Sequence, residues 1–165
     1  MSEEDIKTML YNAGAFDSKN KVQNREIGER YDYIKEEGVG GGKLDFSYTE
    51  IPNVYPDASK NPLTTPSSII FVVDEVAYNH MNFGNFLFGA AGKAMRFFIG
   101  ELTLGAHYNS LNLNRDGGNG YEPQLDSEDD QNSIENGYIH ARDNNYEDIE
   151  YKVEIGPLEY DFGIE

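Results

Sequence analysis

Polar side chains that could do chemistry are concentrated in residues 74–92, a segment otherwise apolar enough to be buried. Asp74, Asn79, His80, Asn82 and Asn85 stand here among valine, phenylalanine, leucine and methionine. Burying such a group without a hydrogen-bond partner costs about 2–7 kcal/mol. These side chains therefore bond either to one another or to a bound molecule. The segment predicts a polar centre, which is either an active site or a hydrogen-bonded core network.

A second polar group begins at residue 126, where Asp126, Glu128, Asp129 and Asp130 precede Gln131. Acids in the first turn of a helix complement its dipole by about 0.3–1 kcal/mol each. Four neighbouring acids also repel one another, which is more than capping requires. They are either capping and solvated residues, or part of a site that faces a metal, a substrate or the histidines.

The three histidines are the side chains best suited to proton transfer near neutral pH. His80 lies in the polar segment, and His107 lies in an apolar stretch. Each is a candidate acid–base catalyst, alone or with a carboxylate; the alternative is a histidine whose hydrogen bonds are satisfied in the core. His140 is expected at the surface, because it lies on the flank of the last predicted helix.

Two loop motifs are incomplete. The glycine run before Lys43 lacks the first glycine and the Ser or Thr of a phosphate-binding P-loop, so it is interpreted as a turn. Asn112, Asn114 and Asp116 match the start of a calcium loop, but Pro123 stands where its closing acid belongs. No cofactor is firmly implied, and a divalent cation is the one that the sequence leaves open.

The composition fits one domain over residues 1–165, with 12 Tyr and 9 Phe available for a core. There is no charge-free apolar run of roughly 18 residues, so no membrane span is expected, and the first residues do not resemble a signal peptide. Without cysteine there is no disulfide, thiolate metal site or cysteine nucleophile. The net charge of −17, concentrated in residues 116–165, repels phosphate backbones and attracts cations and basic partners.

Local patterns predict helices and strands. Ser2 with Asp5, and Ser127 with Asp130, have the spacing of capping boxes that open helices. Hydrophobic periodicity and propensity complete the assignment. The predicted helices cover residues 2–11, 22–36, 85–98 and 127–142, and the predicted strands cover 44–48, 68–73 and 149–155. Residues 101–113 fit either a helix or a strand, and residues 52–67, with four prolines, form an irregular connection.

We therefore expect an α+β fold, a single compact domain with helices packed on a small, largely antiparallel sheet that includes residues 149–155. Residues 74–141 would be its motif-bearing core, and residues 1–66 a helical and irregular N-terminal region. In the helix predicted over 22–36, Ile27, Tyr31 and Ile34 have the spacing of one buried face.

Three elements of this sequence resemble the bacterial polymorphic toxin type 44 family. The first is GNFLFG at residues 84–89 followed by Gly92 and Lys93, the second is LTLGA at residues 102–106, and the third is DSEDDQNSIENG at residues 126–137. Family members carry similar elements in the same order. Ser127 stands where a second aspartate is common in the family.

The resemblance implies an interbacterial effector domain that is made without a signal peptide and exported by a specialised secretion system. It implies a cognate immunity protein and a carrier or larger parent polypeptide as partners. It also implies a hydrolase of the nuclease type, with RNA as the substrate.

We expect the site to form where Asp74, His80, Asn82 and Asn85 meet His107 and the helix start at 126–131. In a metal-independent ribonuclease, a histidine or carboxylate activates the ribose 2′ hydroxyl. Amides and cations then orient the phosphate. The candidate catalytic residues are His80, His107, Asp126 and Asp130, and the candidate substrate-binding residues are Asp74, Asn82, Asn85, Lys93, Arg96 and Gln131.

Two other functions fit the same residues. Paired carboxylates could hydrolyse a cell-envelope glycan such as peptidoglycan, with Asp126 or Asp130 as the general acid. The strongly acidic C-terminal third could instead belong to a non-enzymatic protein that binds calcium or a partner.

Overall fold

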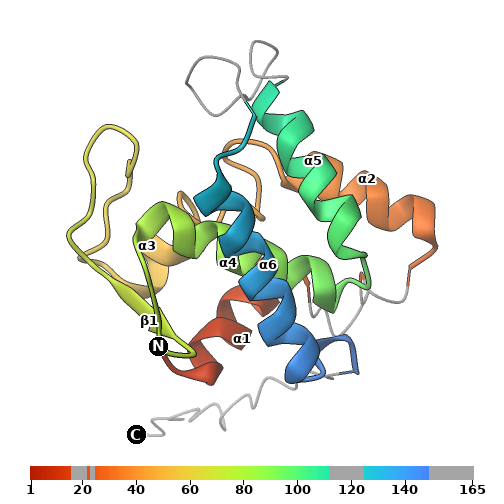
Figure 1. Ribbon diagram of the computed structural model, residues 1–165, viewed down its shortest axis with the longest axis horizontal. Helices are drawn as coiled ribbons and strands as arrows, with labels where there is room; N and C mark the ends of the chain where they lie inside the picture. The colour runs from red at the N-terminus through yellow and green to blue at the C-terminus, as the bar shows by residue number, and fades with distance from the viewer. Residues whose placement is uncertain (16–21, 23–24, 112–124, 149–165) are drawn as a thin grey trace, which may run out of the picture.

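The computed structural model describes residues 1–15, 22, 25–111 and 125–148, and the described chain is mostly helical (Figure 1). Two short strands form an antiparallel sheet in which Phe71 pairs with Tyr78 and Val73 with Val76. The predicted α+β class is confirmed, with helices dominant. The elements are α1 (Glu3–Asn12), α2 (Ile27–Glu37), α3 (Glu50–Val54), β1 (Phe71–Val73), β2 (Val76–Tyr78), α4 (His80–Ala94), α5 (Ile99–Leu111), α6 (Glu128–Asp143) and the 3-10 helix η2 (Tyr146–Asp148).

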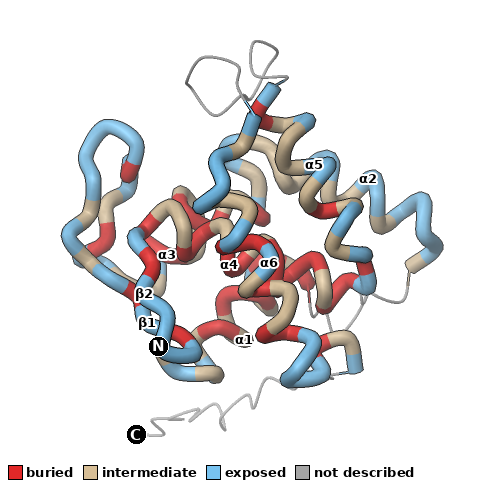
Figure 2. The backbone as a smooth tube through the Cα atoms, in the orientation of Figure 1, coloured by how far each residue is buried: buried red, intermediate tan, exposed pale blue. Residues whose placement is uncertain are grey.

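Helices α4 and α6 cross at the centre of the molecule, and glycines allow their backbones to touch. A Cβ on Gly89 would collide with the carbonyl of Ile134, and a Cβ on Gly137 would collide with the carbonyl of Phe86. Buried residues are concentrated where these two helices and α1 meet (Figure 2). The glycines therefore set how closely the polar side chains of α4 and α6 approach one another.

The core combines residues from both ends of the described chain. Ile6, Met9 and Leu10 of α1 are buried in the same cluster as the apolar residues of α4 and α6. Phe71 of β1 stacks on Phe83 of α4, with ring centroids 4.4 Å apart. Among the described residues before 66, those of α1 together with Leu44, Phe46 and Ile51 are thus packed against the region that carries the motifs.

Helices α5 and α2 lie side by side at one edge of the molecule (Figure 1). The hydroxyl of Tyr31 on α2 donates to the carboxylate of Glu101 on α5. The guanidinium of Arg30 donates to the carbonyl of Met95, just after α4, over 2.8 Å. Polar contacts thus join α2 to its neighbours, alongside the partly buried Tyr33 and Ile34, which pack against the core.

The tight turn between β1 and β2 has an unfavourable backbone conformation. Asp74 has φ 50° and Glu75 has φ 66°, the left-handed region that Gly, Asn and Asp most often occupy in such hairpin turns. Glu75 is none of these, so the turn costs conformational energy that other contacts of the hairpin must offset.

Several predicted elements are confirmed with shifted ends. Both capping boxes open their helices as predicted, at Ser2 for α1 and at Ser127 for α6. Residues 99–111 are helical, and β1 lies within the predicted strand over 68–73. Helix α4 begins earlier than predicted, at His80, because the side chain of Asn79 accepts the backbone N–H of Asn82 over 2.8 Å.

Two local predictions are wrong. Residues 44–48 form turns rather than a strand, because the amides of Tyr48 and Thr49 both donate to the carbonyl of Asp45. Helix α2 begins at residue 27 rather than 22, and its predicted face is buried only in part: Ile34 packs against the core, whereas Ile27 is 60% exposed and Tyr31 is 40% exposed.

The strand predicted over residues 149–155 lies outside the described residues. Within the described ranges, no helix combines the length and the apolar character needed to cross a membrane.

Candidate functional site

His80, the first residue of α4, lies inside the protein. Its side chain is bonded through Nε2 to the carbonyl of Ser47 over 2.8 Å, and the residue is only 3% exposed. Burial lowers the pKa of the imidazole, so the neutral form is favoured. Its Nδ1 has no hydrogen-bond partner among the described residues. A substrate in solvent cannot reach this ring in the folded structure.

Asn85 and Asp130 are brought together across the α4–α6 crossing. The amide nitrogen of Asn85 donates to Oδ1 of Asp130 over 2.7 Å. The other carboxylate oxygen, Oδ2, accepts from the hydroxyl of Ser127 over 2.7 Å and from its backbone N–H over 3.2 Å. Asp130 therefore closes the capping box and links two helices, and both of its oxygens are already engaged.

Asp126 links α6 to α5. One carboxylate oxygen accepts from the hydroxyl of Ser110, and the other accepts from the side-chain nitrogen of Gln131 over 2.8 Å. Because an ionised carboxylate can only accept, Gln131 must present its nitrogen to Asp126. This leaves the side-chain oxygen of Gln131 buried without a partner among the described residues.

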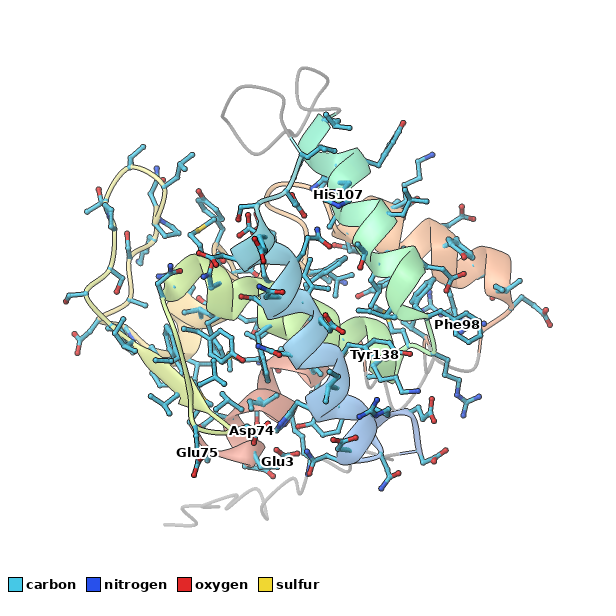
Figure 3. All side chains as sticks on the ribbon, in the orientation of Figure 1. Glu3, Asp74, Glu75, Phe98, His107 and Tyr138 are labelled. Carbon is cyan, nitrogen blue, oxygen red and sulfur yellow. The ribbon has the colours of Figure 1, made fainter. Side chains whose placement is uncertain are left out.

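An open groove of about 590 Å³ runs between α5 and α6. His107 lines it from α5, on the side that faces the start of α6 (Figure 3), and Glu135 lines it from α6. His107 is half-buried, and its Nδ1 is buried without a partner among the described residues. The remaining lining residues are Ile99, Gly100, Thr103, Leu104, Gln131 and Asn132.

Two buried polar atoms without partners thus belong to residues that line one groove. The oxygen of Gln131 can accept a hydrogen bond, and the imidazole of His107 can donate or accept according to its protonation. An unsatisfied buried polar group is costly, and both atoms are covered by protein, so each would gain free energy from a ligand group that it meets when its side chain turns toward the groove. The groove thus carries an imidazole and a carboxylate on facing helices, within a lining that is otherwise largely apolar and includes Ile99 and Leu104.

The predicted cations do not line this groove. Lys93 is 2.8 Å from the carboxylate of Glu147, and its ammonium lies 5.5 Å from the ring centroid of Tyr138. Arg96, which has φ 66°, donates to the carbonyl of Glu147 over 3.4 Å. Both cations are therefore held near η2 and are not among the residues that line the groove.

Asp74 and Asn82 also lie apart from the groove. Asp74 is in the β1–β2 turn and bonds to His140 over 2.7 Å. Asn82 is in the first turn of α4, where its backbone N–H donates to the side-chain oxygen of Asn79. The site residues predicted from sequence are thus divided: His107, Asn85, Asp126, Asp130 and Gln131 gather at the start of α6, and the others lie elsewhere.

The prediction that His140 lies at the surface is wrong. The residue is 6% exposed, and its imidazole contacts the side chains of Glu3, Asp74 and Tyr146. Its flank of α6 is covered because glycines allow α6 to approach α4 closely. There the ring of Phe86 packs against the imidazole, with ring centroids 5.4 Å apart. Helical periodicity alone could not reveal that close approach.

The structure adds groove residues that sequence reasoning did not single out, chiefly Glu135, Asn132, Thr103 and the nearby Ser110. Glu135 follows Gln131 by four residues, so both lie on one face of α6. That spacing was readable in the sequence, but nothing there indicated that α5 would cover the same face.

Within the described part of the chain, no group of three or more His, Asp or Glu side chains is arranged to hold a metal ion. The calcium candidates Asn112, Asn114 and Asp116 lie outside the described residues.

No protein-family model matches this chain, and no curated protein or solved structure is significantly similar to it.

Proposed function

We propose that this protein is an interbacterial effector of the polymorphic-toxin kind, a hydrolase of the ribonuclease type whose site is the α5–α6 groove. The observation that carries the proposal is that His107 of α5 lines one groove with Gln131 and Glu135 of α6, and that Nδ1 of His107 and the side-chain oxygen of Gln131 lack partners among the described residues. The toxin class rests on the resemblance of residues 84–93, 102–106 and 126–137 to that family.

The groove offers the two proton-transfer groups that RNA cleavage requires without a metal. Glu135 takes the proton of a ribose 2′ hydroxyl, and that oxygen attacks the phosphorus. His107 in its protonated form donates to the departing 5′ oxygen, so a 2′,3′-cyclic phosphate forms as the chain breaks. Gln131 accepts from a sugar hydroxyl or a base N–H, while the amide of Asn132 donates to the phosphate.

Asn85, Asp130 and Asp126 act as positioning residues in this proposal. The Asn85–Asp130 hydrogen bond fixes the start of α6 against α4, and Asp126 fixes Gln131 and α5. Lys93 and Arg96 are assigned no phosphate contact, because both are occupied near η2.

Hydrolysis of a cell-envelope glycan is the second candidate, and one observation favours it. The described residues that line the groove include neither Lys nor Arg, and the chain carries a net charge of −17. An uncharged polysaccharide would not be repelled as RNA would. Glu135 and Asp126 would supply the two carboxyl groups that glycoside hydrolysis needs.

Expression in a bacterial host with and without a periplasmic export signal separates the two substrates. Growth arrest only from the cytoplasm, with fragmented cellular RNA, supports the ribonuclease. Arrest only from the periplasm, with lysis, supports the envelope hydrolase. If the full chain is harmless in both compartments, the toxin proposal is wrong.

Variants of the groove test whether the chemistry resides there. Glu135→Gln and His107→Asn should each reduce the rate of substrate cleavage by about 10²–10⁴-fold, the usual contribution of a general acid or base. Asp129→Asn is the matched control, since Asp129 is an exposed acid on α6 that does not line the groove. Equal activity in all three variants would place the active site elsewhere.

A further inference from the structure

His140 connects three segments that are distant in the sequence. Its Nδ1 lies 2.7 Å from a carboxylate oxygen of Asp74 in the β1–β2 turn, and its Nε2 lies 3.0 Å from a carboxylate oxygen of Glu3 on α1. The hydroxyl of Tyr146 on η2 is 3.2 Å from the same Nε2 and donates to Glu3. Figure 3 shows Glu3 and Asp74 side by side near the C-terminal end of α6.

Counting protons at this cluster gives the charge state that the geometry fits. A neutral imidazole carries one N–H, whereas the protonated ring carries two. An ionised carboxylate can only accept hydrogen bonds. Both ring nitrogens face carboxylates, and the protonated ring donates to both at once. A neutral ring can keep its N–H on Asp74 and accept from the Tyr146 hydroxyl at Nε2, but it then loses its hydrogen bond to Glu3.

Other charged groups of the described residues lie around the ring. On α1, Lys7 lies 3.3 Å from Glu3 and its ammonium is 5.7 Å from the centroid of the Tyr146 ring, while Glu4 adds a negative charge near Tyr146. From α4 the ring is faced by Phe86, which is uncharged. Burial, together with the hydrogen bond to Glu3, raises the pKa of Tyr146, so its hydroxyl stays protonated and remains a donor.

The turn that presents Asp74 is independently unusual. Asp74 and Glu75 both have positive φ without being glycine. Strain of about 1–3 kcal/mol per such residue persists only where surrounding contacts hold it. The bond to His140 is a contact that can hold this turn. The hydrogen bonds of the ring go to Asp74, Glu3 and Tyr146 and not to Glu75, which Figure 3 shows on the far side of Asp74 from α6.

We propose that His140 is a proton-dependent clasp that fastens α1 and the β1–β2 turn to α6 when its ring is doubly protonated, and that loosens them when the ring loses a proton. The clasp adds to the apolar packing of Ile6, Met9 and Leu10 beneath it. Its release therefore loosens α1 locally. Because release follows the loss of a proton, the looser form is favoured as pH rises.

Amide hydrogen exchange of the intact chain at about pH 6 and about pH 8.5 tests the clasp, after correction for intrinsic exchange rates. The protection of α1 amides should fall about tenfold or more at the higher pH, since hydrogen bonds to charged groups are among the strongest in proteins. Amides of α4 should change much less. Imidazole nitrogen shifts of His140 should report two bound protons at the lower pH.

Asp74→Asn and Glu3→Gln each remove one carboxylate while keeping the size of the side chain, so either should shrink the change in α1 protection with pH. Glu75→Gln is the matched control in the same turn, and it should leave the change intact. The clasp is refuted if His140 carries a single proton at about pH 6, or if Glu75→Gln and Asp74→Asn have the same effect.

Discussion

At the residue scale, the hydrogen bond between Asn85 and Asp130 carries a measurable part of the stability. Asn85→Ala should lower the free energy of unfolding by about 1–3 kcal/mol, because a half-buried carboxylate oxygen of Asp130 loses its only donor from α4. Urea denaturation of the two proteins measures the difference, provided that the slope with denaturant is unchanged.

The control for Asn85→Ala is Asn132→Ala, at an exposed position of α6. Its effect on stability should stay within about 0.5 kcal/mol, as for most surface substitutions. If Asn85→Ala is equally mild, water replaces the Asn85 amide at no cost and the helix crossing does not depend on the pair.

Individual residues show how far the sequence could locate the site. The requirement that buried polar groups find partners correctly indicated that Asn85 would need one, and the motif order placed Asp126–Gln131 as a second cluster. Their meeting depends on the α4–α6 crossing, which no local pattern encodes. For His140 the prediction from the sequence was wrong. Its position on the flank of the helix predicted exposure, whereas the imidazole makes three polar contacts, with α1, the hairpin turn and η2.

At the element scale, the contact between α4 and α6 depends on glycine. Gly137→Ala should destabilise the fold by about 1–3 kcal/mol or more, because the new Cβ would collide with the backbone carbonyl of Phe86, which cannot rotate away. Thermal or urea unfolding measures the loss. The same substitution should weaken the Asn85–Asp130 bond, since the helices must move apart.

Gly105→Ala on α5 is the matched control. Nothing lies within 4 Å of the Cβ it would add, and the residue is exposed within a helix. Alanine there should raise stability by about 0.5–1 kcal/mol, because glycine loses more backbone freedom on folding. Opposite signs for the two substitutions support close helix packing, whereas a stabilising Gly137→Ala would show that α6 does not approach α4 so closely.

Helices were predictable where the sequence contains the capping residues that mark their first turn. The capping boxes at Ser2 and Ser127 place the starts of α1 and α6, because the same side chains that define the pattern make the bonds. The strand predicted over residues 44–48 was wrong because alternation of apolar and polar residues also fits a series of turns. In that segment Leu44 and Phe46 are buried without any strand.

At the scale of the whole molecule, the α+β class followed from composition and periodicity, while the shape of the site did not. The expected hollow joined the polar residues of α4 to the start of α6. In the structure His80 is sealed in the core, and the groove lies instead between α5 and α6. A groove depends on which helix faces are left uncovered, and that is decided by packing across the whole chain.

The net charge of −17 makes a prediction about how the whole protein meets RNA. Proteins that bind nucleic acid through basic residues bind it more weakly as the salt concentration rises. Here the protein repels the phosphate backbone, and the screening length falls from about 30 Å at 0.01 M salt to about 8 Å at 0.15 M. If the substrate is RNA, kcat/KM for cleavage should therefore increase over this range, whereas cleavage of an uncharged glycan should be nearly insensitive to salt.

Measuring the unfolding midpoint at both salt concentrations controls for a change in the folded fraction. A rate of RNA cleavage that falls with added salt would contradict the prediction, and it would indicate that RNA is held by a basic path away from the α5–α6 groove.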